Sequence, residues 1–311
     1  MIRRIPVLLL SLLLDELFGD PPNRWHPVAW MGRFIARAQH HAPPPSSAPA
    51  GQMLYGAGVI LTGSGFVAGA GALLARTTSR LPRVASLLLE VALLKTTFSL
   101  HGLTRAAGQI ADALEKNDLP AARHWLSWHL VSRNTEDMDV SHIAAAVIES
   151  VAENASDGIV APLFFYMLGG LPAALTYRFL NTADAMLGYR DTAREWLGKI
   201  PARVDDVVNL IPARLTALLL WAATSHHSRA WRIWQRDAHL TESPNAGHPM
   251  SAMAGALGVQ LEKSGHYTLG ADLRPPQRQD IPRAVRLIRT AVAAGAFFLA
   301  LSLLLSRKRS R

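Results

Sequence analysis

Three long apolar stretches dominate the sequence, at residues 53–75, 84–103 and 284–305. Each is close to the ~20 residues that an α-helix needs to cross a bilayer. No run of alternating apolar and polar residues is long enough to predict a sheet. The pattern therefore predicts an all-α fold, a polytopic helical integral membrane protein.

Two further apolar stretches are too short or too interrupted to cross a bilayer as single helices. Residues 159–175 are broken by prolines and glycines, and residues 215–223 have about half of the required length. A membrane protein tolerates such pieces where the backbone lines protein or a polar cavity. We therefore expect broken or re-entrant helices.

The apolar stretches carry glycines and charges that constrain their surroundings. Gly65 and Gly69 lie four residues apart, a spacing that favours close helix contact in lipid. Glu90 and Lys95 lie inside the stretch 84–103, where a charge is costly unless it is paired or faces a cavity. That stretch is either a span with satisfied charges or a buried helix of the soluble type.

We expect residues 1–311 to form a single membrane-embedded domain. A linker of Pro, Ser and Ala near residues 39–51 has little capacity to pack. A polar helical excursion from the membrane is predicted near residues 104–142. The apolar start of the chain resembles a signal peptide but lacks a small-residue cleavage site, so we expect it to be retained.

Composition agrees with a membrane protein. Half of the 311 residues are hydrophobic and 18% are charged, below the ~25% charged residues usual in soluble domains. The formal net charge is +9, but the basic residues do not form a stretch with interleaved aromatic residues. No nucleic-acid partner is therefore predicted. The basic tail at residues 307–311 is typical of a membrane-flanking anchor. The absence of cysteine excludes disulfides, thiolate metal sites and cysteine nucleophiles.

The first polar cluster follows the first apolar helix. Prolines at positions 21 and 22 predict a turn after Gly19. Asp15 lies inside the apolar helix, which favours a function over an ordinary helix end, and Asp20 and His26 lie in the turn.

A second cluster contains acidic residues at helical spacing. Glu149, Glu153 and Asp157 fall at positions i, i+4 and i+8, which places them on one face of a helix. Such a stripe is either a solvated face or a site where a cation relieves the repulsion between carboxylates. Hard oxygen ligands of this kind suit Mg²⁺.

The third cluster combines carboxylates with amides. Asn181 shares a helical face with Asp184, and Asp205 shares one with Asn209. Paired carboxylates could bind a metal, or one of them could act as a base. Alternatively, the stretch 203–206 forms a plain local ion pair between Arg203 and Asp206.

A fourth cluster, at residues 243–249, is a turn before a helix of small residues. The free amides at the start of that helix could hold a phosphate, although a turn that caps a helix is the simpler interpretation. The chain has no standard phosphate loop, paired zinc histidines or serine elbow. Histidines 40, 41, 226 and 227 lack zinc spacing and are interpreted as surface residues.

Together these clusters resemble the CobD/CbiB family of cobalamin biosynthesis. The blocks that carry the resemblance span nearly the whole chain, at residues 15–32 (D-E-L-F-G-D-P-P-x-x-W-H-P-V-x-x-M-G), 153–162 (E-N-A-S-D-G-I-V-A-P), 181–189, 203–214 and 243–258. The sequence departs from the family pattern at Ala155, where Thr is usual, and at His248, where an aromatic residue is expected. The second departure argues against His248 as a shared catalytic group.

The resemblance implies adenosylcobinamide-phosphate synthase activity. Such an enzyme forms an amide between a propionate of adenosylcobyric acid and the amine of an aminopropanol or ethanolamine phosphate. The resemblance also implies ATP and Mg²⁺ as cofactors of an amide-forming ligase. Because a carboxylate is a poor acyl donor, activation as an acyl phosphate is the hypothesis for the mechanism.

The resemblance implies roles for individual residues. Candidates for metal binding or for deprotonating the attacking ammonium are Glu153, Asp157, Asp184, Asp205 and Asp206, and the first three are the expected Mg²⁺ ligands. Candidates for substrate binding are Asp15, Asp20, His26, Asn154, Asn181, Arg203, Asn209, Arg214, Asn245 and Gly247, with the two arginines and the turn at 245–247 assigned to phosphate.

The expected location is the inner cell membrane, with all clusters meeting at one, cytoplasmic, face. The expected partners are the corrinoid substrate, the aminoalcohol phosphate, membrane lipid and other cobalamin-biosynthesis enzymes. Two alternatives remain open. One is an AmpE-like signalling membrane protein, which retention of the acidic clusters disfavours. The other is an ion-coupled transporter, in which the same acids would relay ions.

Overall fold

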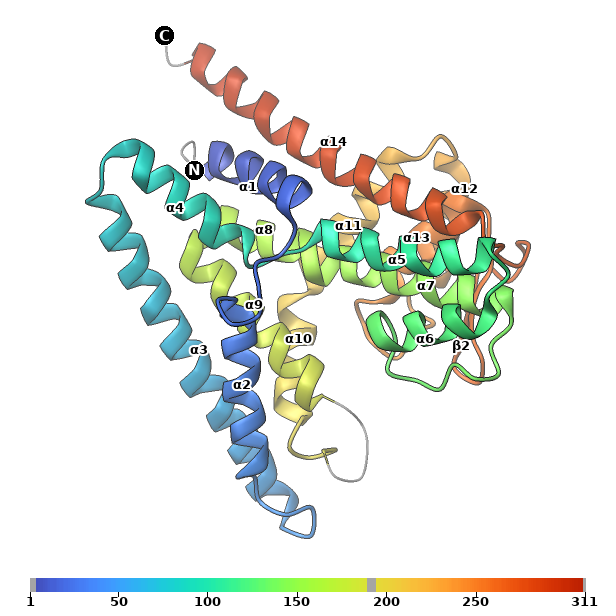
Figure 1. The fold of residues 1–311 in the computed structure, drawn as a ribbon, viewed down its shortest axis with the longest axis horizontal. Coiled ribbons are helices and arrows are strands. Elements are labelled where there is room, and N and C mark those ends of the chain that lie inside the picture. Colours follow the sequence, from blue (N-terminus) through green and yellow to red (C-terminus); the bar gives the residue numbers. More distant parts are fainter. Residues whose placement is uncertain (1–3, 189–193, 310–311) are drawn as a thin grey trace. The chain divides into compact units, whose positions relative to one another are not determined.

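The regular structure of the described residues is helical apart from one short sheet. The computed structural model describes residues 4–188 and 194–309, without the side chains of residues 302–304 and 306–309. In this part of the chain β1 (Leu261–Lys263) and β2 (Tyr267–Leu269), the latter labelled in Figure 1, form a two-stranded antiparallel sheet. In this sheet Leu261 pairs with Leu269. The predicted all-α fold is confirmed.

The chain forms two compact units, each assembled from two separate stretches. The first contains Met1–Ser99 and Ala161–Asn209, and the second contains Leu100–Val160 and Leu210–Arg311. Each unit takes residues from both halves of the sequence, so neither is a continuous piece of chain. The single domain expected for residues 1–311 stays a prediction.

In the first unit, α9 lies at the centre. The helices α2, α3, α8 and α10 pack against it, and α1 packs on α4. Leu175 and Phe179 of α9 belong to a buried apolar core together with Ile35 and Ile60. The helices of this unit are α1 (Arg4–Phe18), α2 (Pro27–His40), α3 (Pro49–Ser79), α4 (Arg83–Lys95), α8 (Ala161–Gly169), α9 (Leu171–Leu187) and α10 (Lys199–Val208).

The turn predicted after α1 is confirmed. Gly19 has a φ of 62°, a conformation that favours glycine, and it ends the helix after Phe18. The prolines that follow cannot continue a helix. The next helix starts at Pro27, where the His26 side chain accepts the N–H of Val28 at 3.2 Å.

Glycines allow α3 to approach its neighbours closely, at positions other than those predicted. A Cβ at Gly63 would lie 2.0 Å from the Phe179 ring, and a Cβ at Gly56 would lie 2.2 Å from the Leu197 carbonyl oxygen. A Cβ at Gly65 or Gly69 would meet nothing within 4 Å. The expected contact at Gly65 and Gly69 is therefore wrong, because the packed face of α3 carries the glycines that lie seven residues apart.

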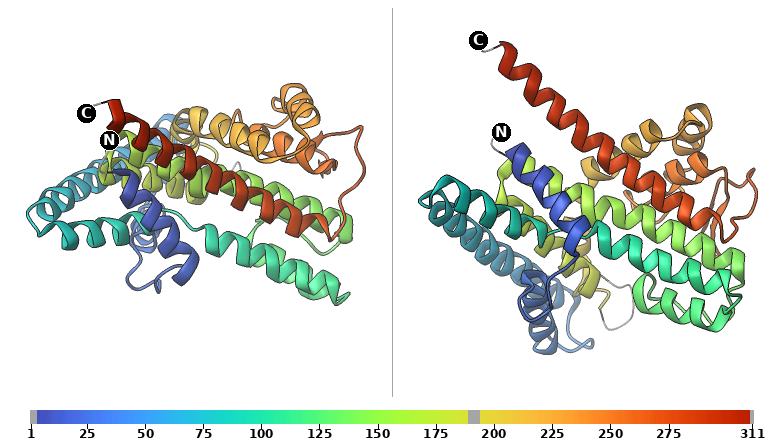
Figure 2. Two further views of the ribbon diagram at one scale, coloured as in Figure 1. Left: turned by 90° about the horizontal axis from the view of Figure 1, so that it is seen from above. Right: turned by 45° about the horizontal axis from the view of Figure 1, so that its top comes forward.

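In the second unit, α7 has a long buried stretch, and residues 143–152 are all buried. The helix α14 packs along α5, α7 and α11, and Figure 2 shows this side-by-side arrangement. The helices of this unit are α5 (Leu100–Glu115), α6 (Leu119–His129), α7 (Val140–Ala155), the π-helix η1 (Ser156–Val160), α11 (Leu210–Ala223), α12 (His227–Asp237), α13 (Gly247–Leu257) and α14 (Asp280–Arg309).

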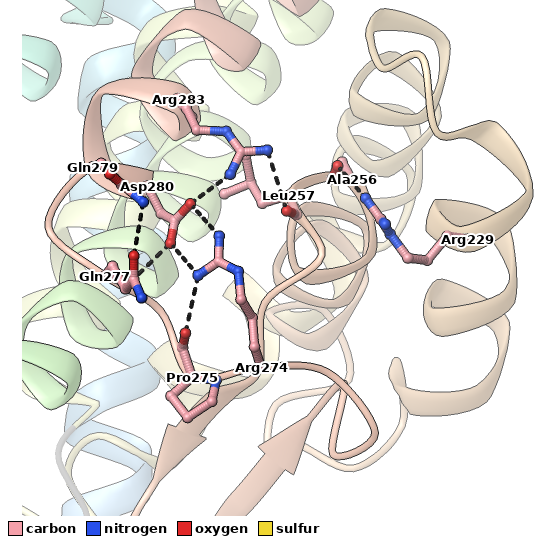
Figure 3. A network of polar contacts seen from close by, with 9 residues as sticks. All are labelled: Arg229, Ala256, Leu257, Arg274, Pro275, Gln277, Gln279, Asp280 and Arg283. Carbon is pink, nitrogen blue, oxygen red and sulfur yellow. Dashed lines mark hydrogen bonds and ion pairs between the residues drawn. The ribbon is translucent and has the colours of Figure 1, made fainter.

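An ion-paired carboxylate fixes the start of α14. Asp280 is fully buried and accepts hydrogen bonds from Arg274 at 2.8 Å and from Arg283 at 2.6 Å (Figure 3). In the same view Arg283 reaches the Leu257 carbonyl oxygen and Arg229 reaches that of Ala256, at the end of α13. These contacts tie the first turn of α14 to the end of α13.

Three described helical stretches are long and apolar enough to cross a membrane. They are Pro49–Ser79, Arg83–Glu115 and Asp280–Leu301, and α10 with α11 is a fourth if the two are taken as one broken span. They contain the predicted stretches 53–75 and 84–103 and overlap the stretch 284–305 up to residue 301, so multiple spans are confirmed. The candidate span at residues 84–103 lies within Arg83–Glu115, but this stretch is not one continuous helix, because α4 ends at Lys95 and α5 begins at Leu100.

The break expected within residues 159–175 is confirmed. The π-helix η1 ends at Val160, α8 ends at Gly169, and Gly170 has a φ of 71° before α9 begins. The expected Pro-rich linker is shorter than residues 39–51, since α2 ends at His40 and α3 begins at Pro49. The excursion expected at residues 104–142 is helical and contains most of α5 and all of α6.

Candidate active site

A buried ion-paired group in the first unit joins the residues predicted after α1. Lys95 Nζ lies 2.9 Å from Asp15 Oδ1 and also binds Asp20 Oδ1. Asp15 and Lys95 are only 1% and 3% exposed. His26 Nε2 lies 3.6 Å from Asp20. The structure therefore brings Asp15, Asp20 and His26 together around a lysine.

This environment holds Asp20 in its ionised form. Burial acts to raise the pKa of Asp20, but hydrogen bonds from His26, Lys95 and Ser99 keep it well below its usual value. The sequence shows that the charge of Lys95 needs an acidic partner. The two aspartates that pair with it lie at least 75 residues away along the chain. Glu90, the other charge in this apolar stretch, accepts a hydrogen bond from the Tyr166 hydroxyl at 2.8 Å.

A cavity of about 1300 Å³ lies beside this ion-paired group. Asp20 and Lys95 form part of its wall, which is otherwise mostly apolar. Such a cavity suits the apolar part of a large ligand. Sequence reasoning missed it because its wall comes from helices far apart in the chain, with aromatic contributions from Trp25, Trp30, Phe34, Phe66 and Phe179.

Asp205 is the centre of a cluster of amides and carboxylates between α9 and α10. Asn209 donates to Asp205 Oδ2 at 2.8 Å, and Asn181 donates to Asp205 Oδ1 at 3.4 Å. The Tyr177 hydroxyl donates to Asn209 Oδ1 at 2.8 Å. Asp205 is 7% exposed, so these amides hold a buried carboxyl group in one orientation. The predicted pairing of Asp205 with Asn209 is confirmed.

Two further carboxylates adjoin this cluster. Burial, together with the negative charge of Asp206, raises the pKa of Asp184 to about 6. Asp205 interacts electrostatically with both Asp184 and Asp206. All three carboxylates are therefore close enough to influence one another. Arg203 Nη1 lies 3.7 Å from Asp206 Oδ2 with its side chain 72% exposed, which matches the local ion pair kept as the alternative.

In the second unit the acidic stripe is only partly retained. Glu149 is buried and accepts a hydrogen bond from Arg133 Nη2 at 3.2 Å, whereas Glu153 is exposed. Burial raises the pKa of Glu149 to about 7, Arg133 opposes this rise, and the charge of Glu153 adds to it. Asp157 lies beyond the end of α7, in η1, whose wider turn breaks the i, i+4, i+8 spacing predicted for the stripe.

The amide nitrogen of Asn154 bonds to Ser150, one turn earlier in α7, and to neither Glu149 nor Glu153. Its Nδ2 donates to the Ser150 carbonyl oxygen at 2.9 Å and to the Ser150 hydroxyl at 3.1 Å. Burial, together with the negative charges of Glu149 and Glu153, raises the pKa of the Tyr267 phenol, which lies on β2. Sequence reasoning did not identify Tyr267 or Arg133 as neighbours of Glu149.

The turn before α13 joins two residues predicted to bind substrate. Arg214 Nη1 donates to Asn245 Oδ1 at 3.1 Å, and Asn245 is buried. A Cβ at Gly247 would lie 2.1 Å from the Ala238 carbonyl oxygen, so the close approach of α12 requires glycine. The Ser243 hydroxyl accepts the N–H groups of Asn245 and Ala246, which supports the interpretation of a capped turn.

His248 serves as a neutral hydrogen-bond acceptor. Its Nδ1 accepts the indole N–H of Trp234 at 2.9 Å. Burial and the nearby Arg214 lower the pKa of His248 to about 4. The four histidines interpreted as surface residues are all exposed.

The predicted site residues gather into separate groups within each unit. The first unit holds the Asp15–Lys95–Asp20 group and the Asp184–Asp205–Asp206 cluster, and the second holds the Glu149 and Asn245 neighbourhoods. Among the described residues no three His, Cys, Asp or Glu side chains gather in a way that could hold a metal ion. The Mg²⁺ ligands expected at Glu153, Asp157 and Asp184 stay a prediction. Tyr189, in the third block of the family resemblance, and the side chains of the basic tail at 307–311 lie outside the described residues.

These features define a class: a multi-span helical membrane protein whose polar helix ends bury clusters of carboxylates, amides and arginines. The chain belongs to the CobD/CbiB family. The sequence profile described as "CobD/Cbib protein" matches residues 8–288.

Individual relatives agree over most of the chain. "Cobalamin biosynthesis protein CobD" of Dehalococcoides mccartyi (strain CBDB1) is 41% identical over 92% of this chain and 92% of its own. "Probable cobalamin biosynthesis protein CobD" of Methanothermobacter thermautotrophicus is 37% identical over 91% and 92%. "Cobalamin biosynthesis protein CbiB" of Salmonella arizonae is 35% identical over 96% of both chains. No solved structure matches the chain.

Proposed function

We propose that this protein is an adenosylcobinamide-phosphate synthase of cobalamin biosynthesis. The observation that carries the proposal is the 41% identity, over 92% of both chains, to a protein named for cobalamin biosynthesis. The reaction forms an amide bond between a propionate carboxyl of adenosylcobyric acid and the amine of aminopropanol or ethanolamine phosphate. The AmpE-like and transporter alternatives gain no support from the relatives' names.

The reaction needs an activated carboxyl group and a base. ATP would supply the activation, because phosphate is a good leaving group whereas oxide is not. The amine must lose a proton before it attacks, so a carboxylate with a pKa near neutrality is a suitable base. The raised pKa of Asp184 and its place beside Asp205 and Asp206 support this role.

A magnesium ion fits the donor chemistry of the same cluster. Mg²⁺ is commonly bound by one or two carboxylates together with substrate phosphates, and needs no cage of three protein ligands. As an alternative to its role as the base, Asp184 could join Asp206 as a neighbouring hard oxygen donor, and the two could provide two of the bonds. Bound there, the ion would neutralise phosphate charge and the repulsion between the carboxylates.

The cavity beside Lys95 supports a large substrate. Its volume of about 1300 Å³ and mostly apolar wall suit a macrocyclic ring. We place the protein in the inner membrane, with the site at the cytoplasmic face where a nucleotide would be available. Other enzymes of cobalamin biosynthesis are proposed partners.

Complementation tests the function directly. A strain that needs this synthase for growth on cobyric acid should grow when it carries the wild-type gene, and should accumulate cobinamide phosphate. The Asp157→Asn variant should insert into the membrane at the wild-type level but fail to restore growth. If the inserted wild-type protein produces no cobinamide phosphate, the proposed function is wrong.

A further inference from the structure

A second, polar cavity lies in the second unit, and none of its lining residues is one that the sequence assigns to the reaction. It has a volume of about 460 Å³, which is enough for a small molecule. One side is the face of α6 that carries Arg123 and Ser127, at spacing i and i+4. The other side is the segment 133–136, which follows α6.

The charge of this cavity favours an anion. Two guanidinium groups, of Arg123 and Arg133, line it together with one carboxylate, that of the exposed Glu136. The Asn134 side-chain oxygen already accepts the N–H of Glu136 at 2.9 Å, so its amide nitrogen remains as a donor. Guanidinium and amide donors on facing walls are the groups that bind phosphate oxygens.

The two arginines are held in place by contacts outside the cavity. Arg123 Nε donates to the Met138 carbonyl oxygen at 2.8 Å. Arg133 Nη2 donates to Glu149 Oε2 at 3.2 Å, and Glu149 is 5% exposed. Because each arginine uses one donor for positioning, its remaining donors are presented on a rigid fork.

One donor in this arrangement lacks an acceptor. Arg133 Nε is buried and has no hydrogen-bond partner among the described residues. A buried N–H without a partner is costly, and native structures rarely keep one without a reason. An anion that draws the Arg133 guanidinium toward the cavity could accept that hydrogen bond.

We infer that the Arg123–Arg133 cavity binds the terminal phosphate group of a small organic phosphate. The inference rests on the proposed function, in which both the aminoalcohol phosphate and ATP carry phosphate. It goes beyond that function by placing the phosphate in the segment 119–138, and by making Glu149 a positioning residue that aims Arg133.

The binding test uses the full chain in detergent and isothermal titration calorimetry. The ligands are inorganic phosphate, ethanolamine phosphate and ATP, titrated separately. Arg133→Lys keeps the charge but loses the planar fork, so we expect at least a tenfold rise in the Kd for the phosphate ligand that uses this cavity. Arg105→Lys, an exposed arginine on α5, is the matched control and should leave every Kd unchanged.

The pattern of weakened ligands identifies the source of the phosphate. A rise confined to ethanolamine phosphate assigns the cavity to the aminoalcohol phosphate, and a rise confined to ATP assigns it to the nucleotide. Glu149→Gln should raise the Kd for the same phosphate ligand and leave the KM for the corrinoid unchanged. Only variants with the Tm of the wild type are used for the comparison of Kd values. If Arg133→Lys does not fold, Arg133→Gln takes its place.

The inference and the proposed function fail in different ways. If the wild type forms cobinamide phosphate, but Arg133→Lys and Arg133→Gln bind all three ligands as tightly as the wild type, the cavity is not a phosphate site. If Arg133 governs phosphate binding but the wild type has no synthase activity, the cavity assignment stands and the function does not.

Discussion

Lys95 and Asp15 show how single charged residues can lie inside apolar helices of this protein. Both are almost fully buried, and their charged atoms are 2.9 Å apart. Removing one partner of such a pair leaves an uncompensated charge, which costs far more than the pair itself contributes. The pair therefore limits which substitutions the first unit can accept.

Replacing Lys95 with Met should destabilise the protein by about 3–5 kcal/mol, because Asp15 then loses its buried cation. The double variant Asp15→Asn, Lys95→Met should recover much of that loss, since no charge is left buried at these two positions. Thermal unfolding in detergent measures both. Lys116→Met, at an exposed position, is the control. A single variant as stable as the wild type would show that the buried pair is not formed.

Asp184 offers a test of the acidic cluster through pH. Its pKa is raised to about 6, so the carboxylate form dominates only above that pH. If Asp184 is the base, the rate of amide formation should rise with pH through about 6 and level off above it. Asp184→Ala should lose activity while inserting into the membrane normally. Unchanged turnover in that variant would remove Asp184 from the site.

At the scale of elements, glycine positions decide how closely α3 packs. Gly56 and Gly58 lie on the same helix in the same unit, but only Gly56 faces a neighbouring backbone. The distinction depends on the rotation of the helix about its axis. The count of glycines in the sequence does not contain that information.

Gly56→Ala should destabilise the protein by about 1–3 kcal/mol, because its new Cβ would lie 2.2 Å from the Leu197 carbonyl oxygen. Gly58→Ala meets nothing within 4 Å and should be neutral or slightly stabilising, since alanine is the better helix former. Urea or thermal unfolding of the two variants compares them directly. Equal stabilities would mean that α3 is rotated differently.

Breaks between elements were predictable where the sequence contains backbone signals. Proline and glycine mark the turn after α1 and the interruption before α9. The break between α4 and α5 has no such signal, and the hydroxyls of Thr96 and Thr97 bond to carbonyl oxygens of the preceding turn there. A continuous helix was therefore predicted where the structure has two.

At the scale of the whole molecule, the absence of cysteine makes the topology directly testable. If α3 crosses the membrane, the segment before it and the segment after it lie on opposite faces. Single cysteines at Ser46→Cys and Arg80→Cys, both at exposed positions, would report on these two segments. In oriented vesicles an impermeant thiol reagent should label one of them and spare the other. Labelling of both would show that α3 does not span.

The sequence by itself determined the helical class, the number of long apolar stretches, the family and the polar clusters. These follow from local composition, from periodicity and from blocks of residues at recognisable spacing. It also predicted contacts over one helical turn, such as Asp205 with Asn209, because spacing sets which residues share a face.

Only the tertiary structure decided which distant groups meet. Lys95 pairs with Asp15 and Asp20, Glu149 pairs with Arg133, and the cavity wall is drawn from helices far apart in the chain. These contacts depend on the packing of helices on one another, and burial then sets the pKa of groups such as Asp184. Neither helix packing nor burial is encoded in local spacing, because both arise from the sum of many weak contacts across the fold.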